Sequence, residues 1–167
     1  NLLFASYGMA VLGIGGIYMK KEIKEFVDKQ EAKGFALEFY GDFANSLGEL
    51  RTKVGSIQAS GRYTTEPQDK FCIDAIKEMF RNCPKTPFDI VAYRCGEMKY
   101  DNRPYLSASL LKSGALGHGD CPNKIVIKKG SLIFPLRALG LAYGDSEAEI
   151  IIVTKCLKKK SGYYIYK

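Results

Sequence analysis

The stretch GDSEAEIIIV, residues 144–153, decides how the second half of this chain folds. Its run of consecutive β-branched residues predicts a buried strand. Two glutamates, Glu147 and Glu149, stand where that strand begins. Because side chains alternate along a strand, residues two apart share a side, and we expect both carboxylates to reach one substrate. A glycine-bearing loop that carries Tyr143 comes just before them.

Two earlier stretches carry polar residues in or beside apolar runs. FDIVAYRCG, residues 88–96, places Arg94 at the end of one run, and YLSAS, residues 105–109, places Ser107 and Ser109 on one face of a short strand. A guanidinium at the end of a buried strand needs an anion, and its planar fork suits phosphate or carboxylate. A structural ion pair is the competing interpretation. The serines lack the G-x-S-x-G signature of a nucleophile, so we expect them to act by hydrogen bonding.

The first half of the chain is predicted to be helical. Apolar residues recur at helical spacing in three segments, Lys20–Lys33, Phe35–Val54 and Asp69–Asn82, and Gly34 is the expected end of the first. The segment 55–68 is rich in turn-forming residues and is expected to be a loop.

Short strand-like runs fill the second half: Asp89–Arg94, Tyr105–Ser109, Lys124–Lys128, Ser131–Phe134, Glu149–Val153 and Tyr163–Tyr166. Helices followed by strands are typical of an α+β domain. The chain has 167 residues and 46% apolar content, which suffices for one domain with a substantial core. We expect an apolar segment at 1–19 and a domain at 20–167, with a helical part at 20–87 and a strand-rich part at 88–167.

Residues 2–19 form an uncharged apolar run, LLFASYGMAVLGIGGIYM, which Lys20 and Lys21 follow. This length is at the lower limit for a membrane span. A secretory signal would carry its basic residues before the run rather than after it. Three interpretations are open: a helix packed on the domain, a membrane-active or translocation segment, and a buried hairpin.

Charge and cysteine content narrow the classes of function. The net charge of +7 indicates either a solubilising basic face or attraction to anions such as nucleotide, nucleic acid or an acidic partner. There are five cysteines but no C-x-x-C pair, and the single histidine, His118, cannot complete a zinc site, so no metal is expected. Cys72 and Cys83 flank a predicted helix, which leaves a disulfide open, although we favour reduced thiols. No G-x-G-x-x-G follows a strand, which argues against a dehydrogenase.

Taken together, the three polar stretches resemble the motifs of the mono-ADP-ribosyltransferases, in the branch similar to clostridial binary toxins and to phage or interbacterial effectors. Tyr93-Arg94 resembles the family's aromatic–arginine strand, Ser107-Ala108-Ser109 its S-T-S motif, and Glu147-Ala148-Glu149 its E-x-E motif. The order and the spacing fit over residues 88–167. The resemblance implies an α+β fold with a helical N-terminal half and a two-sheet mixed β-core.

The resemblance also implies a role for each catalytic residue, with NAD as a consumed substrate. Glu149 would bind the nicotinamide-ribose 2′-hydroxyl and stabilise the cation that forms as nicotinamide leaves. Glu147 would position and help to deprotonate the acceptor, and Ser107 would hydrogen-bond Glu149. Because an arginine acceptor is protonated at ordinary pH, its attack needs a nearby base. In the family, E-x-E suggests an arginine acceptor.

Further residues would bind NAD or the acceptor. The resemblance implies that Arg94 contacts the diphosphate or the nicotinamide ribose, with Tyr93 and Ser109 in the same site. Phe134, between the second and third motifs, would stack on nicotinamide, and Tyr143 would contact the acceptor. For both aromatics, a place in the core is the competing interpretation.

The implied biology is a toxin domain that is secreted or injected and acts on a target protein in the cytoplasm of another cell. A cognate immunity protein would plug the NAD cleft. The chain begins with Asn1 rather than Met, which suggests a domain cut from a longer chain. Membrane contact is expected only through residues 2–19. Two alternatives stay open: an NAD glycohydrolase of the same fold, and a basic module that binds nucleic acid or protein through Lys155–Lys160 and the tyrosines of residues 163–166.

Overall fold

A helical first half packs against a strand-rich second half in a computed structural model that describes residues 22–65, 67–99, 102–140 and 148–167. The helices are α1 (Lys29–Ser46), α2 (Glu49–Ala59), α3 (Lys70–Arg81) and α4 (Lys112–Leu116), with short 3₁₀ turns at Arg62–Thr64 (η1), Leu136–Leu139 (η2) and Thr154–Cys156 (η4). The strands are β1 (Ile90–Arg94), β2 (Tyr105–Ser109), β3 (Asn123–Ile127), β4 (Phe134–Pro135), β5 (Glu149–Val153), β6 (Leu157–Lys159) and β7 (Tyr164–Tyr166). The expected α+β class is confirmed.

The strands make one mixed sheet in the order β4-β5-β2-β1-β3-β7-β6. One half of the sheet is β4-β5-β2 and the other is β1-β3-β7-β6. Within the halves the strands are well paired, with five residue pairs between β2 and β5 and five between β1 and β3. The halves meet only at Tyr93↔Ser109, the one pair between β1 and β2. The two sheets that the resemblance implies therefore correspond to the two halves of one sheet, and β1 and β2 separate beyond this pair.

The first predicted helix begins later than expected. Residues 22–28 are not helical, and Lys24 instead forms a parallel bridge to Ile90 at the start of β1. The Asp28 carboxylate accepts hydrogen bonds from the amides of Gln30 and Glu31, which makes it the N-cap of α1. The expected end at Gly34 is also wrong, because α1 runs on to Ser46 and buries a continuous apolar stripe.

The predicted loop at 55–68 is partly helical, whereas α3 lies where the sequence predicts it. Val54 and Ile57 are buried on one face of α2, which ends only at Ala59. The α3 helix is capped by the Asp69 carboxylate, which accepts from the Cys72 amide at 2.8 Å. Its predicted apolar face is correct except at Phe71, which is 48% exposed.

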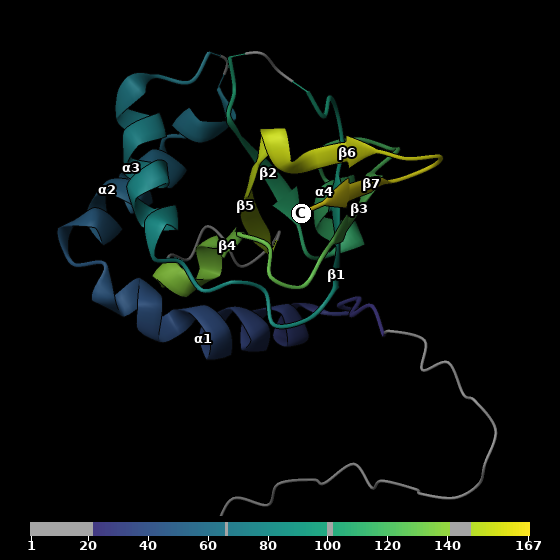
Figure 1. The fold of residues 1–167 in the computed structure, drawn as a ribbon, viewed down its shortest axis with the longest axis horizontal. Helices are drawn as coiled ribbons and strands as arrows, with labels where there is room; N and C mark the ends of the chain where they lie inside the picture. Colours follow the sequence, from purple (N-terminus) through teal and green to yellow (C-terminus); the bar gives the residue numbers. More distant parts are fainter. Residues whose placement is uncertain (1–21, 66, 100–101, 141–147) are drawn as a thin grey trace, which may run out of the picture.

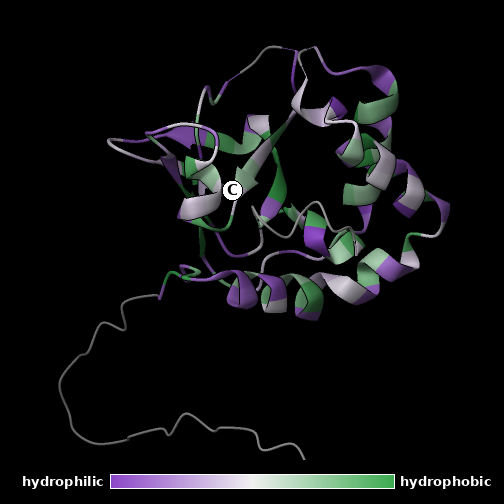
Figure 2. Ribbon diagram, turned by 180° about the vertical axis from the view of Figure 1, so that it is seen from behind, coloured by the Kyte–Doolittle hydropathy of each residue, from purple (hydrophilic) through white to green (hydrophobic). Residues whose placement is uncertain are grey.

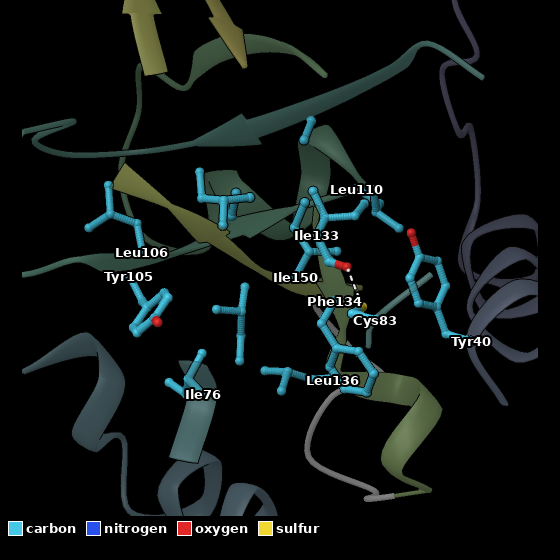
Figure 3. Packing of buried hydrophobic residues seen from close by; sticks show 14 of the residues in the cluster. Tyr40, Ile76, Cys83, Tyr105, Leu106, Leu110, Ile133, Phe134, Leu136 and Ile150 are labelled. Atoms are coloured by element: carbon cyan, nitrogen blue, oxygen red, sulfur yellow. Dashed lines mark hydrogen bonds between the residues drawn. The ribbon is translucent and has the colours of Figure 1, made fainter. Parts of the chain in front are cut away.

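The main core lies between the first three helices and the sheet (Figure 1). Figure 2 shows hydrophobic residues in the central strands and hydrophilic ones on outer helix faces and on the β6–β7 hairpin. Figure 3 shows the hydroxyl end of Tyr40, from α1, directed towards Leu110. Phe134 of β4 lies beside Cys83, whose thiol contacts the Ile133 carbonyl oxygen. Within the described ranges, no helix is long and apolar enough to cross a membrane. The predictions for residues 2–19 fall outside those ranges.

Candidate active site

The β2–β5 ladder brings the second and third sequence motifs together. In its antiparallel register, Ser109 lies opposite Glu149, the first residue of β5. The Ser107 hydroxyl, two residues along the same face of β2, donates to Glu149 Oε1 at 2.5 Å. The predicted pairing of Ser107 with Glu149 is thus present in the structure.

A second hydroxyl, which the sequence did not single out, also holds this carboxylate. Tyr63 of η1 donates its hydroxyl hydrogen bond to Glu149 Oε1, and its side chain is buried. Gln68 supports this turn from behind: its amide nitrogen donates to the Tyr63 carbonyl and, at 3.0 Å, to the Tyr105 carbonyl on β2. Charge-assisted bonds from two hydroxyls fix the carboxylate more tightly than one could. The sequence predicts a loop at 55–68, and nothing in that pattern indicates that Tyr63 would reach the site.

Arg94 crosses the gap between the two halves of the sheet. Its Nη1 donates to the Ser107 carbonyl at 2.6 Å, and its Nε donates to the Glu97 carbonyl at 3.2 Å. Where β1 and β2 separate, the main-chain hydrogen bonds between them end, and the Arg94 guanidinium bonds to the Ser107 carbonyl in their place. The same side chain ties the first motif to the strand that carries the second.

A cavity of about 260 Å³ opens where β1 and β2 separate. Six residues of the three motifs line it: Tyr93, Arg94, Ser107, Ala108, Ser109 and Glu149. Thr64, Cys95 and His118 add polar atoms that the sequence analysis did not assign to the site. The three stretches therefore form one concave polar site, the kind of place where small ligands bind.

A smaller cavity of about 100 Å³ is also lined by Glu149. Lys29 and Lys33 reach it from α1, and Arg137 reaches it from η2. Three cationic side chains beside one carboxylate favour the binding of an anion. These residues belong to the helical half and to a short 3₁₀ turn, so no motif in the sequence pointed to them.

Two of the predicted ligand-binding residues have main-chain or side-chain partners of their own. The Tyr93 hydroxyl donates to the Glu25 carboxylate, and burial together with this bond raises the pKa of Tyr93 to about 12. The Ser109 hydroxyl donates to the Leu111 carbonyl at 2.7 Å and accepts from the Leu111 amide at 3.0 Å. Both residues shape the cavity wall, and their polar atoms help to hold the surrounding chain.

The stacking role predicted for Phe134 does not fit its position. Its ring is 0% exposed and packs edge-on against Tyr40 and Phe43, with centroids 6.1 Å from each. Figure 3 shows it inside the main core, next to Tyr40 and Leu136. A ring enclosed in this way presents no face to a ligand, so the competing interpretation, a core residue, is correct.

The residue between Glu147 and Glu149 does not have extended backbone. Alternation places residues two apart on one side only along extended backbone. Ala148 instead has φ of 46°, in the left-handed region that non-glycine residues rarely adopt. Its carbonyl accepts from the Leu110 amide at 3.0 Å, which holds this conformation against β2. Alternation therefore does not extend across Ala148, and Glu147 and Tyr143 themselves lie outside the described residues.

All five cysteines are free thiols. Burial raises the pKa of Cys72 to about 11 and that of Cys83 to about 12, so both stay protonated at neutral pH. No cluster of His, Cys, Asp or Glu suited to a metal ion occurs among the residues that the structure describes.

Comparison with known proteins identifies the fold. No protein-family model matches the chain, and no curated protein matches it in sequence. The structure is similar to Plx2a, an ADP-ribosyltransferase toxin from Paenibacillus larvae, with a TM-score of 0.61 and 15% identity over 79% of this chain and 86% of that one. It is similar to BECa, an ADP-ribosylating toxin of a binary enterotoxin of C. perfringens, with a TM-score of 0.59 and 15% identity over 79% of this chain and 42% of that one.

A third similar structure is the Clostridium limosum C3 exoenzyme, with a TM-score of 0.52 and 15% identity over 87% of this chain and 95% of that one. The protein thus has the fold of the ADP-ribosyltransferase toxins. In this fold, the three stretches that resemble the family's motifs converge on one cavity.

Proposed function

We propose that this protein is an NAD-dependent mono-ADP-ribosyltransferase that transfers ADP-ribose to a target protein and releases nicotinamide. One observation carries the proposal: the Glu149 carboxylate accepts from Ser107 and Tyr63 at the wall of a polar cavity. The protein shares its fold with ADP-ribosylating toxins, and BECa was crystallised with NADH. Fold alone does not define an activity, so the proposal rests on this site.

Glu149 would act on the bond between nicotinamide and ribose. When that bond breaks, its electron pair leaves with nicotinamide, whose positive charge is neutralised, and the ribose becomes an oxocarbenium cation. A fixed carboxylate beside the sugar stabilises this cation without having to reorganise. The Ser107 and Tyr63 hydroxyls both donate to Oε1, which leaves Oε2 to accept from the ribose 2′-hydroxyl.

The cations around Glu149 would bind the diphosphate. Arg94 lines the larger cavity, and Arg137, Lys29 and Lys33 line the smaller one. Diphosphate oxygens suit both the planar fork of an arginine and the point charge of a lysine. NAD would then lie beside Glu149, with its reactive ribose against the carboxylate and its diphosphate against these cations. Tyr93 and Ser109 would complete the wall of this site.

We propose arginine as the acceptor residue because of the E-x-E motif. Glu147 would deprotonate the acceptor guanidinium, which otherwise stays charged at ordinary pH, and Tyr143 would contact the acceptor protein. Nitrogen of the acceptor then attacks the cationic carbon of the ribose, and Glu147 takes the proton that the nitrogen loses. In the absence of an acceptor, water would attack instead, which is the NAD glycohydrolase alternative.

The proposed setting is that of a secreted or injected toxin domain that acts in the cytoplasm of a target cell, with a cognate immunity protein as its partner. The structure disfavours part of the competing hypothesis, a basic module that binds nucleic acid by stacking on tyrosines. Tyr166, one of its expected stacking residues, is 1% exposed, and its hydroxyl is bonded to main-chain groups of Leu132 and Val153. A ring held in this way cannot stack on a base.

The test is to incubate the protein with labelled NAD and a cell lysate, then to identify modified peptides by mass spectrometry. We expect labelled protein with ADP-ribose on arginine, and none with Glu149→Ala. Glu38→Ala, on the exposed face of α1, is the matched control and should label normally. Nicotinamide release without protein labelling would favour the glycohydrolase, and labelling that is equal in Glu149→Ala would refute the proposed site.

A further inference from the structure

A second concave surface lies at the far end of the β2–β5 ladder. It measures about 550 Å³, which is larger than either cavity beside Glu149. Tyr105 and Val153, a facing pair of the ladder, form part of its wall. This pair lies four residues along β2 and β5 from the Ser109↔Glu149 pair, or roughly 13 Å at the usual rise of a strand. We call this surface the far groove.

The far groove combines an apolar lining with a basic rim. Ile73, Leu132 and Val153, all half-buried, supply aliphatic surface from three separate parts of the chain. Lys77, Lys85 and Lys155 are exposed at its edge, and Lys167 also lines it. Among the described residues that line the groove, none has an acidic side chain. Within the described residues, no carboxylate forms an ion pair with Lys77, Lys85 or Lys155.

The walls of the far groove are held by main-chain bonds. The Thr154 amide donates to the Pro104 carbonyl at 2.8 Å, and the Lys167 amide donates to the Cys156 carbonyl at 3.2 Å. On the opposite wall, the Thr86 amide donates to the Ser131 carbonyl at 3.0 Å. The groove is therefore formed before any partner arrives, which lowers the entropic cost of binding.

We propose that the far groove binds an acidic segment of a partner protein, in which an aliphatic or aromatic side chain is flanked by carboxylates. The apolar side chain would enter between Ile73, Leu132 and Val153, where burial drives association. The flanking carboxylates would meet the lysines of the rim, which speeds the encounter and selects the partner. The site is separate from the proposed NAD cavity and does not depend on its activity.

The shape and lining of the groove favour a peptide over other anions. Its two aromatic residues, Phe80 and Tyr105, are each 6% exposed and pack against one another at 5.9 Å, so neither offers an open face on which a base could stack. A flat anionic membrane would meet the lysines but leave the apolar floor uncovered. A protruding side chain of a partner protein fills that floor.

The test is a selection from a library of random displayed peptides against the full chain, followed by fluorescence anisotropy on the enriched peptides. The groove variant is Lys85→Glu with Lys155→Glu. Its matched control is Lys158→Glu with Lys159→Glu, which changes the net charge equally on exposed β6 residues outside the groove. Thermal unfolding followed by circular dichroism confirms that both variants are folded.

We expect enriched peptides that combine acidic residues with an aliphatic or aromatic one. The groove variant should weaken their binding by about tenfold or more, because attraction to two lysines becomes repulsion, and the control should bind within about twofold of the original chain. An absence of enriched peptides would overturn the proposal, as would equal weakening in both variants. Polyuridine or phosphatidylserine vesicles whose binding is lost only in the groove variant would assign the groove to nucleic acid or membrane instead, and would also overturn it.

Discussion

The two ends of the β2–β5 ladder differ in chemistry although they share the same two strands. At one end, Ser107 meets Glu149 beside a polar cavity. At the other end, Tyr105 and Val153 wall a groove that is apolar inside and basic at its rim. Ile150, Ile151 and Ile152 lie between the two ends and are 0% exposed. The buried middle of the ladder thus provides a rigid base that holds two unlike surfaces a fixed distance apart.

The difference arises from what packs around each end. Near Glu149, the separation of β1 from β2 leaves polar strand atoms open to a ligand, and η1 adds the Tyr63 hydroxyl. Near Val153, α3 lies over the strands and contributes Ile73 and Lys77. Gln68 bonds to main-chain groups of both Tyr63 and Tyr105 and so connects the two regions. The helical half, which carries no motif, therefore contributes side chains to both sites.

The largest expected effect is the loss of activity on substituting Glu149, and it should differ from the effect of substituting Glu147. Glu149→Ala should abolish both protein labelling and NAD hydrolysis, because the cation loses its fixed carboxylate. A loss of about a hundredfold to a thousandfold is typical when such a stabilising group is removed. Glu147→Ala should lose labelling and keep part of the hydrolysis, because only acceptor activation is affected. Parallel assays of nicotinamide and labelled protein measure both; an equal loss of the two activities in both variants would contradict this division of labour.

Arg94→Lys should give the next largest effect. The ammonium of lysine cannot reach the Ser107 and Glu97 carbonyls at once, as the arginine fork does. We therefore expect weaker anion binding and a displaced β2. We expect kcat/KM for NAD to fall by about tenfold to a hundredfold. Peptide binding at the far groove should be unchanged, since that end has its own walls. A parallel loss at both ends would show that the two sites are not independent.

Tyr63→Phe removes one of the two hydroxyls that hold Glu149 and should lower kcat for nicotinamide release by about tenfold. KM should change little, because the ring and the rest of the cavity are retained. Ser107→Ala, which removes the other hydroxyl, is the matched variant. The double variant should lose more than either alone, whereas a Tyr63→Phe enzyme with unaltered kcat would reduce this tyrosine to a packing role.

The smallest expected effect concerns a property that the two ends share. Burial raises the pKa of Tyr93, at the polar end, and of Tyr105, at the far groove, to about 12 in each case, from an ordinary value near 10. The folded protein therefore holds these protons more tightly than the unfolded chain does. This stabilisation is complete below pH ~10 and is lost as pH rises towards 12.

Urea unfolding at several pH values between 8 and 12 measures this loss. The free energy of unfolding should decline most steeply above pH ~10, and Tyr105→Phe should make the decline shallower. Lys85→Glu, at the rim of the same groove, serves as the control that leaves both tyrosines in place. An identical decline in Tyr105→Phe would show that this tyrosine does not contribute to it.

Local signals in the sequence predicted some parts of the fold well. Apolar residues at helical spacing over Asp69–Asn82 located α3, and the β-branched run at 150–153 located β5. The start of α1 was misplaced because Ile23 and Phe26 have helical spacing, whereas the Asp28 cap and the bridge from Lys24 to Ile90 keep residues 22–28 out of the helix. Local periodicity contains no information about such a long-range bridge.

The candidate site was predictable where strand register decides it and unpredictable where packing does. Ser107 and Glu149 were singled out because they stand in strand-like runs whose motifs resemble those of the ADP-ribosyltransferases, and the register of β2 with β5 brings them together. Tyr63 was missed because it belongs to a short turn whose position depends on how Gln68 joins it to β2. The far groove was missed for the same reason, since its lining comes from segments that are far apart in the sequence.

The most direct test of the account is the rate of nicotinamide release from NAD by the purified protein alone, compared between the original chain and Glu149→Gln. The substitution keeps the size of the side chain and leaves acceptors for Ser107 and Tyr63, but it removes the negative charge. We expect steady release by the original chain and a loss of about a hundredfold or more in the variant. Equal release by the two proteins, or none by either, would contradict the claim that Glu149 stabilises the ribosyl cation in an NAD site.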